Sequence, residues 1–454
     1  MNLNLFHQNT VKRREMILKG SIPKTLLLLS LPTLMMGIVQ SIVPVMDGLF
    51  INNILGTIAA SSITYCVPII NILVSLAQGL SVAAIAIIGQ MNGRGNYKAA
   101  KHTSTQIVIF AFVLGCIMAP LLVLLAYPIS WNIDPRISHD VFVYLALNSM
   151  VLPFIFLESI YNSIKNAAGK PEATFIRMVL MLILKLLFNT LFILLFHWGI
   201  FGAVMASLMA NVIISIWMYF ELFVTVGEDK LSLDNFRFDK KVLSKLIMLG
   251  IPAMLSSIML NLGFFLINNE IEKYGPIILN GQGIAGSITS VCFNLPAAFG
   301  AAVTTMVSMN VGAGQSDKAK KSCIVACIVS AITAIILIAI VVPLASHITV
   351  LFTQDKEVID IANKSLHIYT YSVVGFGICM VEQGAFIGLG RTKIPLLVSI
   401  LRVWLLRYIF ILCTEKYLGF YAVFWGNLFS NYAAAVITTI LILRIKWVST
   451  LKQG

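Results

Sequence analysis

Residues 107–127 read IVIFAFVLGCIMAPLLVLLAY, an apolar run without a charged side chain. About 20 apolar residues wound as an α-helix cross the hydrocarbon core of a bilayer. This run lies inside a longer apolar segment, residues 99–128, and eleven similar segments predict a protein with twelve membrane spans. The other predicted spans are 25–50, 57–90, 139–165, 172–196, 200–225, 243–271, 279–312, 319–346, 358–388, 394–415 and 419–447.

The composition agrees with a protein that faces lipid. Of 454 residues, 59% are hydrophobic and only 11% are charged, whereas about 25% of a soluble domain is charged. The net charge of +13 does not indicate a nucleic-acid partner, because the basic residues lie in short gaps between apolar runs and form no single patch. The seven cysteines are odd in number and lie mostly in apolar runs, so we expect neither a disulfide framework nor a metal site.

The distribution of basic residues predicts the orientation of the spans. If the N-terminus is cytoplasmic, 23 of the 32 Lys and Arg residues fall in inside segments and five fall in outside segments. Positively charged loops are retained on the cytoplasmic side. We therefore predict a multi-pass membrane protein with both termini in the cytoplasm.

The two halves of the chain repeat one another at a nearly constant offset. SLPTLMMGIVQ (30–40) aligns with GIPAMLSSIML (250–260), and GRGNYKAAK (93–101) aligns with GAGQSDKAK (312–320). Because each repeat has an even number of spans, its two copies share one orientation, which predicts two lobes related by an axis along the membrane normal, with a central cleft. The predicted parts are a cytoplasmic tail (1–24), a first lobe (25–225), a cytoplasmic linker (226–242), a second lobe (243–447) and a C-terminal tail (448–454).

Four further stretches carry a resemblance to a known family. They are VMDGLFINNILGTIAASSI (45–63), GQMNGRGNYKAA (89–100), FNTLFILLFHWGIFGAVMAS (188–207) and AFIGLGRTKIPLLVSILR (385–402). In their order and spacing they resemble the multidrug and toxic-compound extrusion (MATE) family. The resemblance implies an all-α fold of twelve transmembrane helices, two six-helix lobes in a V shape, and export driven by a proton or sodium gradient. It also implies a place in the bacterial plasma membrane, the inner membrane of the cell.

Asp47 is the acidic residue of the first apolar run. A carboxylate at mid-membrane costs about 2.5–3.5 kcal/mol on insertion scales, so it is expected to face a cavity or a partner. By resemblance, Asp47 is the first-helix Asp of the family, Lys185 and Asn189 replace an Asn and an Asp of its ion site, and Ser207 replaces its Thr. We hypothesise that Lys185 and Asp47 form an ion pair. Such a pair would favour protons over sodium as the coupling ion, or would make the transport cycle independent of a bound metal ion. Lys185 as a simple structural anchor is the alternative.

The second lobe contains its own intramembrane charges. Glu382 lies on the tenth predicted span and Arg402 on the eleventh, where a Glu–Arg pair would line or lock the cleft. Structural ion pairing is the role that we favour for Arg402 and its neighbour Arg407, whereas Glu382 is equally consistent with a structural or a functional role.

The sequence therefore predicts a monomeric antiporter that exports organic, cationic or amphipathic compounds in exchange for protons or sodium, by alternating access and without another cofactor. A flippase of lipid-linked saccharides is the alternative, and it requires a cavity lined by basic residues such as Arg177, Lys185, Arg402 and Arg407. An enzyme is not expected, since the six histidines form no HExxH or similar set. A channel is not expected either, because no filter-like loop or charged ring is found.

Overall fold

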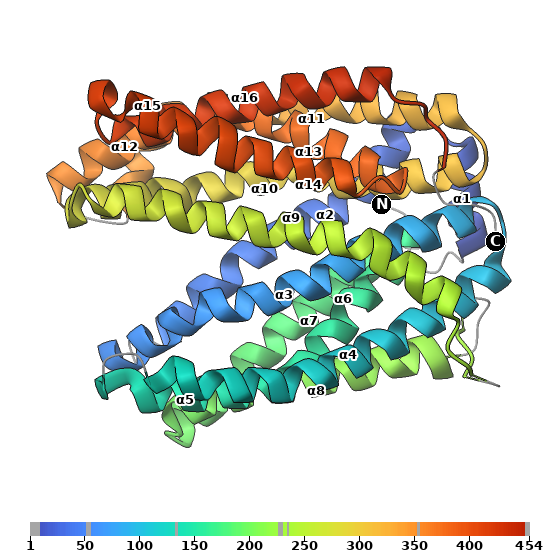
Figure 1. Cartoon of the computed structure of the whole chain (residues 1–454), viewed down its shortest axis with the longest axis horizontal. Helices are drawn as coiled ribbons and strands as arrows, with labels where there is room; N and C mark the ends of the chain where they lie inside the picture. Colours follow the sequence, from blue (N-terminus) through green and yellow to red (C-terminus); the bar gives the residue numbers. More distant parts are fainter. Residues whose placement is uncertain are drawn as a thin grey trace. The chain divides into compact units, whose positions relative to one another are not determined.

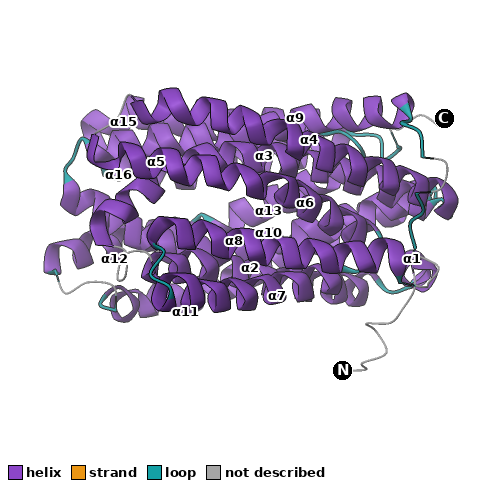
Figure 2. Cartoon of the chain, turned by 90° about the horizontal axis from the view of Figure 1, so that it is seen from below, coloured by secondary structure: helices purple, strands orange, loops and turns teal. Residues whose placement is uncertain are grey.

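The computed structural model of the protein describes residues 10–50, 56–131, 135–225, 230–233, 236–351 and 355–449. Within α2 the side chains of residues 41–50 lie outside the description. Throughout the described part the regular elements are helices, joined by short loops, and no strand is drawn (Figure 2).

The first half of the chain forms a short helix followed by long ones. In chain order these are α1 (Thr10–Lys19), α2 (Ile22–Phe50), α3 (Gly56–Gly93), α4 (Tyr97–Trp131), α5 (Pro135–Asn148), the 3₁₀ turn η3 (Ser149–Val151), α6 (Leu152–Ala167), α7 (Pro171–Asn189) and α8 (Gly199–Tyr219). Two π-helical segments, η4 (Thr190–Leu195) and η5 (Phe220–Val224), continue α7 and α8.

The second half repeats this pattern (Figure 1). Its helices are α9 (Lys240–Glu272), α10 (Pro276–Gly312), α11 (Ser316–Thr349), α12 (Lys356–Tyr371), α13 (Val373–Gly388), α14 (Lys393–Ile400), the π-helical η6 (Leu401–Tyr408), α15 (Ile409–Leu418) and α16 (Tyr421–Arg444).

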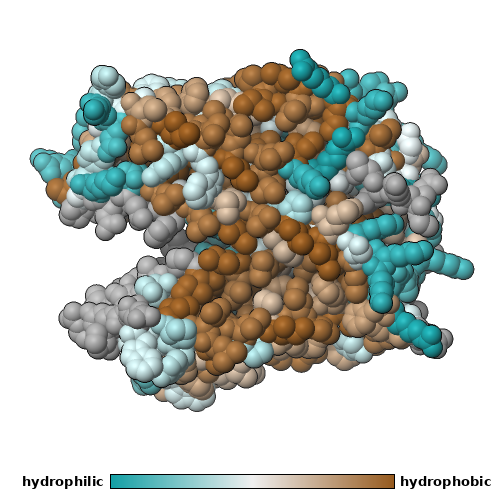
Figure 3. Space-filling model, in the orientation of Figure 1, coloured by the Kyte–Doolittle hydropathy of each residue, from teal (hydrophilic) through white to brown (hydrophobic). Residues whose placement is uncertain are grey.

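The described residues contain 11 helices that are long and apolar enough to cross a membrane. The pair α12 and α13, bent by 43° relative to each other, makes a twelfth span if it is counted as one. The surface supports this interpretation: on α4, Leu124 and Leu125 are 70% and 54% exposed, and hydrophobic side chains cover the middle of the visible face, with hydrophilic ones toward the helix ends (Figure 3). The predicted all-α polytopic membrane fold is confirmed.

The chain divides into two compact units. Unit 1 comprises Met1–Glu15 and Val39–Met254, and unit 2 comprises Met16–Ile38 and Leu255–Gly454. The division differs from the lobes expected from the sequence, because residues 25–38 belong to unit 2 and residues 243–254 belong to unit 1. Close packing explains both differences. A Cβ added to Gly37 of α2 would lie 3.5 Å from the Cβ of Asn294 in α10, and one added to Gly79 of α3 would lie 2.6 Å from the backbone nitrogen of Met254.

Segments that the charge distribution places on one side of the membrane do lie together within each unit. In unit 1, Arg14 Nε of α1 donates to the carbonyl oxygen of Gly93, at the end of α3, at 3.0 Å. In unit 2, Ser316 Oγ at the start of α11 donates to the carbonyl oxygen of Trp447, beyond α16, at 2.6 Å. These two contacts agree with spans that alternate in direction through the membrane. That this side of each unit faces the cytoplasm stays a prediction.

Candidate functional site

A buried arginine of unit 1 is held by an ion pair. The Arg177 side chain on α7 is 1% exposed, and its Nη2 lies 2.7 Å from Glu158 Oε1 of α6. Its Nε donates to Asn162 Oδ1, also on α6, at 3.0 Å. Arg177 thus joins two neighbouring helices, and its charge is compensated inside the protein.

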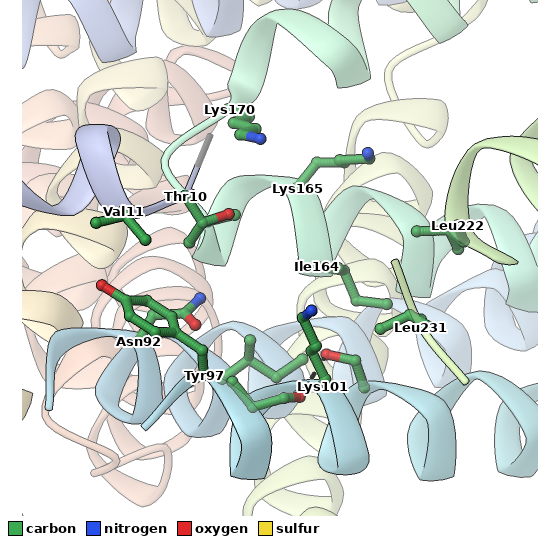
Figure 4. A pocket seen from close by; sticks show the side chains of 14 residues that line it. Thr10, Val11, Asn92, Tyr97, Lys101, Ile164, Lys165, Lys170, Leu222 and Leu231 are labelled. Atoms are coloured by element: carbon green, nitrogen blue, oxygen red, sulfur yellow. Dashed lines mark hydrogen bonds between the residues drawn. The ribbon is translucent and has the colours of Figure 1, made fainter. Parts of the chain in front are cut away.

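Unit 1 also contains a cavity of about 300 Å³ at the ends of α3, α6 and α7 (Figure 4). Lys101, Lys165 and Lys170 contribute to its lining. The Lys165 ammonium lies 2.5 Å from Glu221 Oε1, and the Tyr161 hydroxyl donates to the other oxygen of Glu221. Because its lysines lie at helix ends and one of them is already paired, this cavity has the character of an interfacial pocket rather than a site within the spans.

A second buried ion pair lies beside that cavity. Arg13 of α1, 1% exposed, pairs with Glu172 in the first turn of α7. Burial lowers the pKa of the Arg13 guanidinium, and the Glu172 carboxylate offsets part of that shift. The pair attaches the N-terminal helix to unit 1.

The site expected from the sequence in unit 1 is only partly visible. Lys185 and Asn189 lie four residues apart on α7 and therefore on one face of that helix. Asn189 is buried, while Lys185 and Ser207 of α8 are half-buried. Asp47 belongs to α2, but its side chain lies outside the described residues, so its pairing with Lys185 stays a prediction.

Unit 2 contains a cavity within its spans rather than at their ends. Its volume is about 410 Å³, which is within the range of small-molecule pockets. It is lined by Leu260, Ile267, Gln282, Gly286, Thr289, Ser290, Phe293, Asn294, Tyr369, Phe376, Met380, Arg402, Val403, Arg407, Asn427, Ser430 and Asn431. Among the residues that the structure describes, this lining includes two arginines and no Asp or Glu.

A π-helix brings the two arginines into this cavity. Arg402 and Arg407 are five residues apart, and in an α-helix, at about 100° per residue, they would point in directions roughly 140° apart. Both belong to η6, and the wider turn of a π-helix, with its i→i+5 hydrogen bonds, brings residue i+5 much closer to the face of residue i. The π-helical backbone thus places both guanidinium groups in one cavity, whereas an α-helix over the same residues would direct them to different faces.

The π-helix is packed tightly against α9. Trp404 Nε1 donates to the carbonyl oxygen of Met259 at 2.8 Å. A Cβ added to Gly263, one turn farther along α9, would lie 2.2 Å from Cγ1 of Val403. The glycine therefore allows the close approach that holds η6 in position.

Arg402 has an aromatic neighbour instead of an acidic one. Its side chain is buried, its Cζ lies 5.1 Å from the centre of the Phe376 ring, and its Nη1 has no hydrogen-bond partner in the described part of the chain. The positive charge of Arg402 also acts on Arg407, which is within hydrogen-bonding range of the Tyr369 hydroxyl. The structural ion pair that we favoured for Arg402 is not present among the described residues.

The repeat connects this cavity with the candidate residues of unit 1. At the offset that relates the two halves, Ser207 and Asn211 correspond to Asn427 and Asn431. Asn211 Nδ2 donates to the Ser207 carbonyl oxygen at 2.8 Å, and Asn431 Nδ2 lies 3.2 Å from Asn427 Oδ1. Tyr369, Asn427 and Asn431 were not among the site residues predicted from the sequence, although the repeat offset relates the last two to Ser207 and Asn211.

Glu382 of α13 does not line the cavity and is bound by hydroxyl groups of α16. Its side chain is buried; Thr438 Oγ1 donates to Oε2, and Thr439 Oγ1 donates to Oε1 at 2.8 Å. Among the described residues it forms no ion pair with Arg402, so the locking pair considered from the sequence is not observed.

Comparisons with known proteins identify the family. The family model described as MatE matches residues 32–191 and 252–412, one block in each half of the chain. The chain belongs to the MatE family. The two matched blocks are separated by the same offset as the aligned stretches of sequence, so the family match confirms the internal repeat as well as the resemblance to MATE proteins.

Curated MatE relatives and solved structures cover nearly the same length. The chain is 23% identical over 399 residues to the probable multidrug resistance protein YoeA of Bacillus subtilis, covering 85% of each protein. It is 21% identical over 436 residues to the multidrug export protein MepA of Staphylococcus aureus, covering 93% and 94%. It superposes with a TM-score of 0.89 and 20% identity on an outward-facing multidrug resistance MATE family transporter, covering 94% and 96%. This last likeness shows the fold.

Proposed function

We propose that this protein is a secondary active exporter of amphipathic organic compounds, working by alternating access in exchange for protons or sodium. Its membership in the MatE family and its relatives' names, which refer to multidrug resistance and export, support a transport function. We also propose that it acts as a monomer in the bacterial plasma membrane, with both termini in the cytoplasm.

The observation that carries the proposal is a set of charged groups buried among the spans of unit 2. Arg402 and Arg407 border a 410 Å³ cavity, and Glu382 is buried on α13. Charged side chains at membrane depth are costly, and they mark substrate or ion pathways. A cavity of this size, with aromatic walls and a few polar groups, accommodates a drug-sized organic molecule.

Glu382 is a candidate for the coupling proton because its surroundings fit both protonation states. As a carboxylate it accepts from Thr438 and Thr439. When Glu382 is protonated, its O–H donates to Thr438 Oγ1, whose own hydrogen then turns to the Ala434 carbonyl oxygen at 2.9 Å. Both states are hydrogen-bonded, so a proton enters or leaves without stranding a buried polar group.

The second candidate for coupling is the set Asp47, Lys185, Asn189 and Ser207 in unit 1. Lys185 decides its chemistry, because an ammonium beside Asp47 competes with sodium for the carboxylate. We expect Lys185→Ala to change the pH and sodium dependence of transport. An unchanged rate with unchanged pH and sodium dependence would contradict this role.

Efflux from proteoliposomes tests the proposed function. The purified protein is reconstituted, the vesicles are loaded with fluorescent amphipathic compounds of either charge, and sodium and proton gradients are imposed separately. We expect efflux to follow at least one gradient. Efflux that persists at the same rate after both gradients are collapsed would overturn the antiporter mechanism.

The flippase of lipid-linked saccharides is not favoured. The relatives' names refer to multidrug resistance and export. Of the four basic residues considered for this purpose, Arg177 is bound to Glu158 and Asn162, and Arg402 and Arg407 line the cavity of unit 2.

A further inference from the structure

We propose that the cavity of unit 2 binds the anionic group of an acidic amphipathic substrate through Arg402 and Arg407. The proposal rests on the proposed export function, because it names the class of compound carried. The proposed substrate class is an organic compound with a carboxylate or sulfonate attached to an apolar, aromatic body.

The charges on the cavity wall favour an anionic ligand. Two guanidinium groups from one π-helical turn border the cavity, and none of the described lining residues is acidic. Like charges held together in a poorly hydrated site repel one another, and an anion between them removes that cost. Arg402 additionally has Nη1, an N–H group without a partner among the described residues. A guanidinium binds planar anions such as carboxylates through two parallel hydrogen bonds, so the Arg402 side chain is suited to an acidic ligand.

In unit 1, buried or half-buried basic side chains that connect helices each form an ion pair with a glutamate. Arg13 pairs with Glu172, Lys165 with Glu221, and Arg177 with Glu158. An arginine that only joined helices in unit 2 would be expected to have a similar partner. Arg402 instead lies over an aromatic ring at the wall of an open volume.

The remaining wall fits the body of such a substrate. Phe293 and Phe376 lie with their ring centroids 4.6 Å apart. Because Phe376 is also the ring beside Arg402, the apolar surface and the cationic group are adjacent. Side-chain amides of Gln282, Asn427 and Asn431 supply polar groups that orient a ligand without adding charge.

Equilibrium binding to the detergent-purified protein tests the proposal without any gradient. The probes are dansylglycine and dansylcadaverine, which share one fluorophore and carry a carboxylate or an amine. Because a charge-assisted hydrogen bond contributes about 1.5–3 kcal/mol, we expect the acid to bind roughly 10- to 100-fold more tightly than the amine. Equal affinity, or tighter binding of the amine, would overturn the proposal.

Variants locate the binding. Arg402→Gln is expected to lose most of the preference for the acid, and Arg402→Lys, which keeps the charge but not the planar fork, to retain part of it. Gln282→Glu places a carboxylate on the cavity wall at nearly constant shape, and we expect it to weaken acid binding. Arg444→Gln, at an exposed position at the end of α16, removes the same charge from unit 2 outside the cavity and is the matched control.

Each outcome decides the proposal. A folded Arg402→Gln protein that binds the acid as the wild type does would overturn it. If that variant does not fold, Arg402→Lys and Gln282→Glu decide: reduced acid binding in both supports the proposal, and unchanged binding overturns it. Acid binding without gradient-driven efflux would instead refute the export function, whereas gradient-driven efflux of the amine alone would refute only the anionic substrate.

Discussion

The ion pair between Glu158 and Arg177 allows a quantitative test of which unit 1 charges serve structure. Replacing Glu158 by Leu removes the carboxylate that lies 2.7 Å from the Arg177 guanidinium, while Arg177 stays buried. Losing one partner of a buried pair costs about 3–5 kcal/mol. Glu158 is 25% exposed, so solvent already screens part of this interaction, and we expect a loss of about 2–3 kcal/mol.

The double variant Glu158→Leu/Arg177→Met is expected to recover most of this loss. Apolar residues of similar volume avoid the desolvation cost of both charges, so replacing a buried pair is often neutral. Only Asn162 Oδ1 loses a donor, at a cost of about 1 kcal/mol. The single variant Arg177→Met should be milder than Glu158→Leu, because the remaining carboxylate is partly hydrated.

The assay is the apparent melting temperature of the purified variants, followed by fluorescence-detected size exclusion after heating. The expected order is wild type, then the double variant and Arg177→Met close together, then Glu158→Leu. A Glu158→Leu protein with the melting temperature of the wild type would contradict the structural role of the pair, and so would a double variant whose loss of stability equals the sum of the two single losses. If Arg177 is structural, the double variant also keeps its efflux activity.

Three further predictions concern unit 2. Glu382→Gln mimics the protonated carboxyl, so its efflux should lose the response to a proton gradient; efflux with the wild-type pH dependence would exclude Glu382 as the coupling group. Gly384→Ala should destabilise the protein by about 1–3 kcal/mol or more, since its Cβ would lie 2.2 Å from the Gly300 carbonyl oxygen, and a melting temperature equal to that of the wild type would contradict this packing. Gly263→Ala should displace Val403 with η6 and weaken dansylglycine binding several-fold, while unchanged binding would show that η6 adapts.

The fold was predictable because lipid imposes a strong pattern on sequence. Apolar runs of about 20 residues had to become helices, since hydrocarbon offers no other partners for backbone polar groups. The constant offset between similar stretches likewise predicted the repeat, which the family match confirms. The division of the helices was not predictable in the same way: the assignment of residues 25–38 to unit 2 follows from contacts such as that of Gly37 with Asn294, which link positions far apart in the chain.

The candidate site was predicted less completely. The sequence selected Arg402 and Glu382 because charge is rare in apolar runs, and both side chains are buried in the structure. It also suggested that they form a pair, which is not present among the described residues. Their neighbours decide this: Thr438 and Thr439 bind Glu382, while Phe376 lies beside Arg402, and none of these contacts is local in sequence.

The repeated crossing of the membrane in two related halves follows from the order of residues alone, because hydrophobic length, charge distribution and internal repetition are properties of that order. Which charges are compensated and which face a cavity depends on contacts that form in the folded protein between residues far apart in the chain. The two arginines of η6 illustrate the difference: five residues apart, they diverge on an α-helix, and the π-helix brings them to one cavity. That turn is held by packing against Met259 and Gly263 of α9, which lie far earlier in the chain.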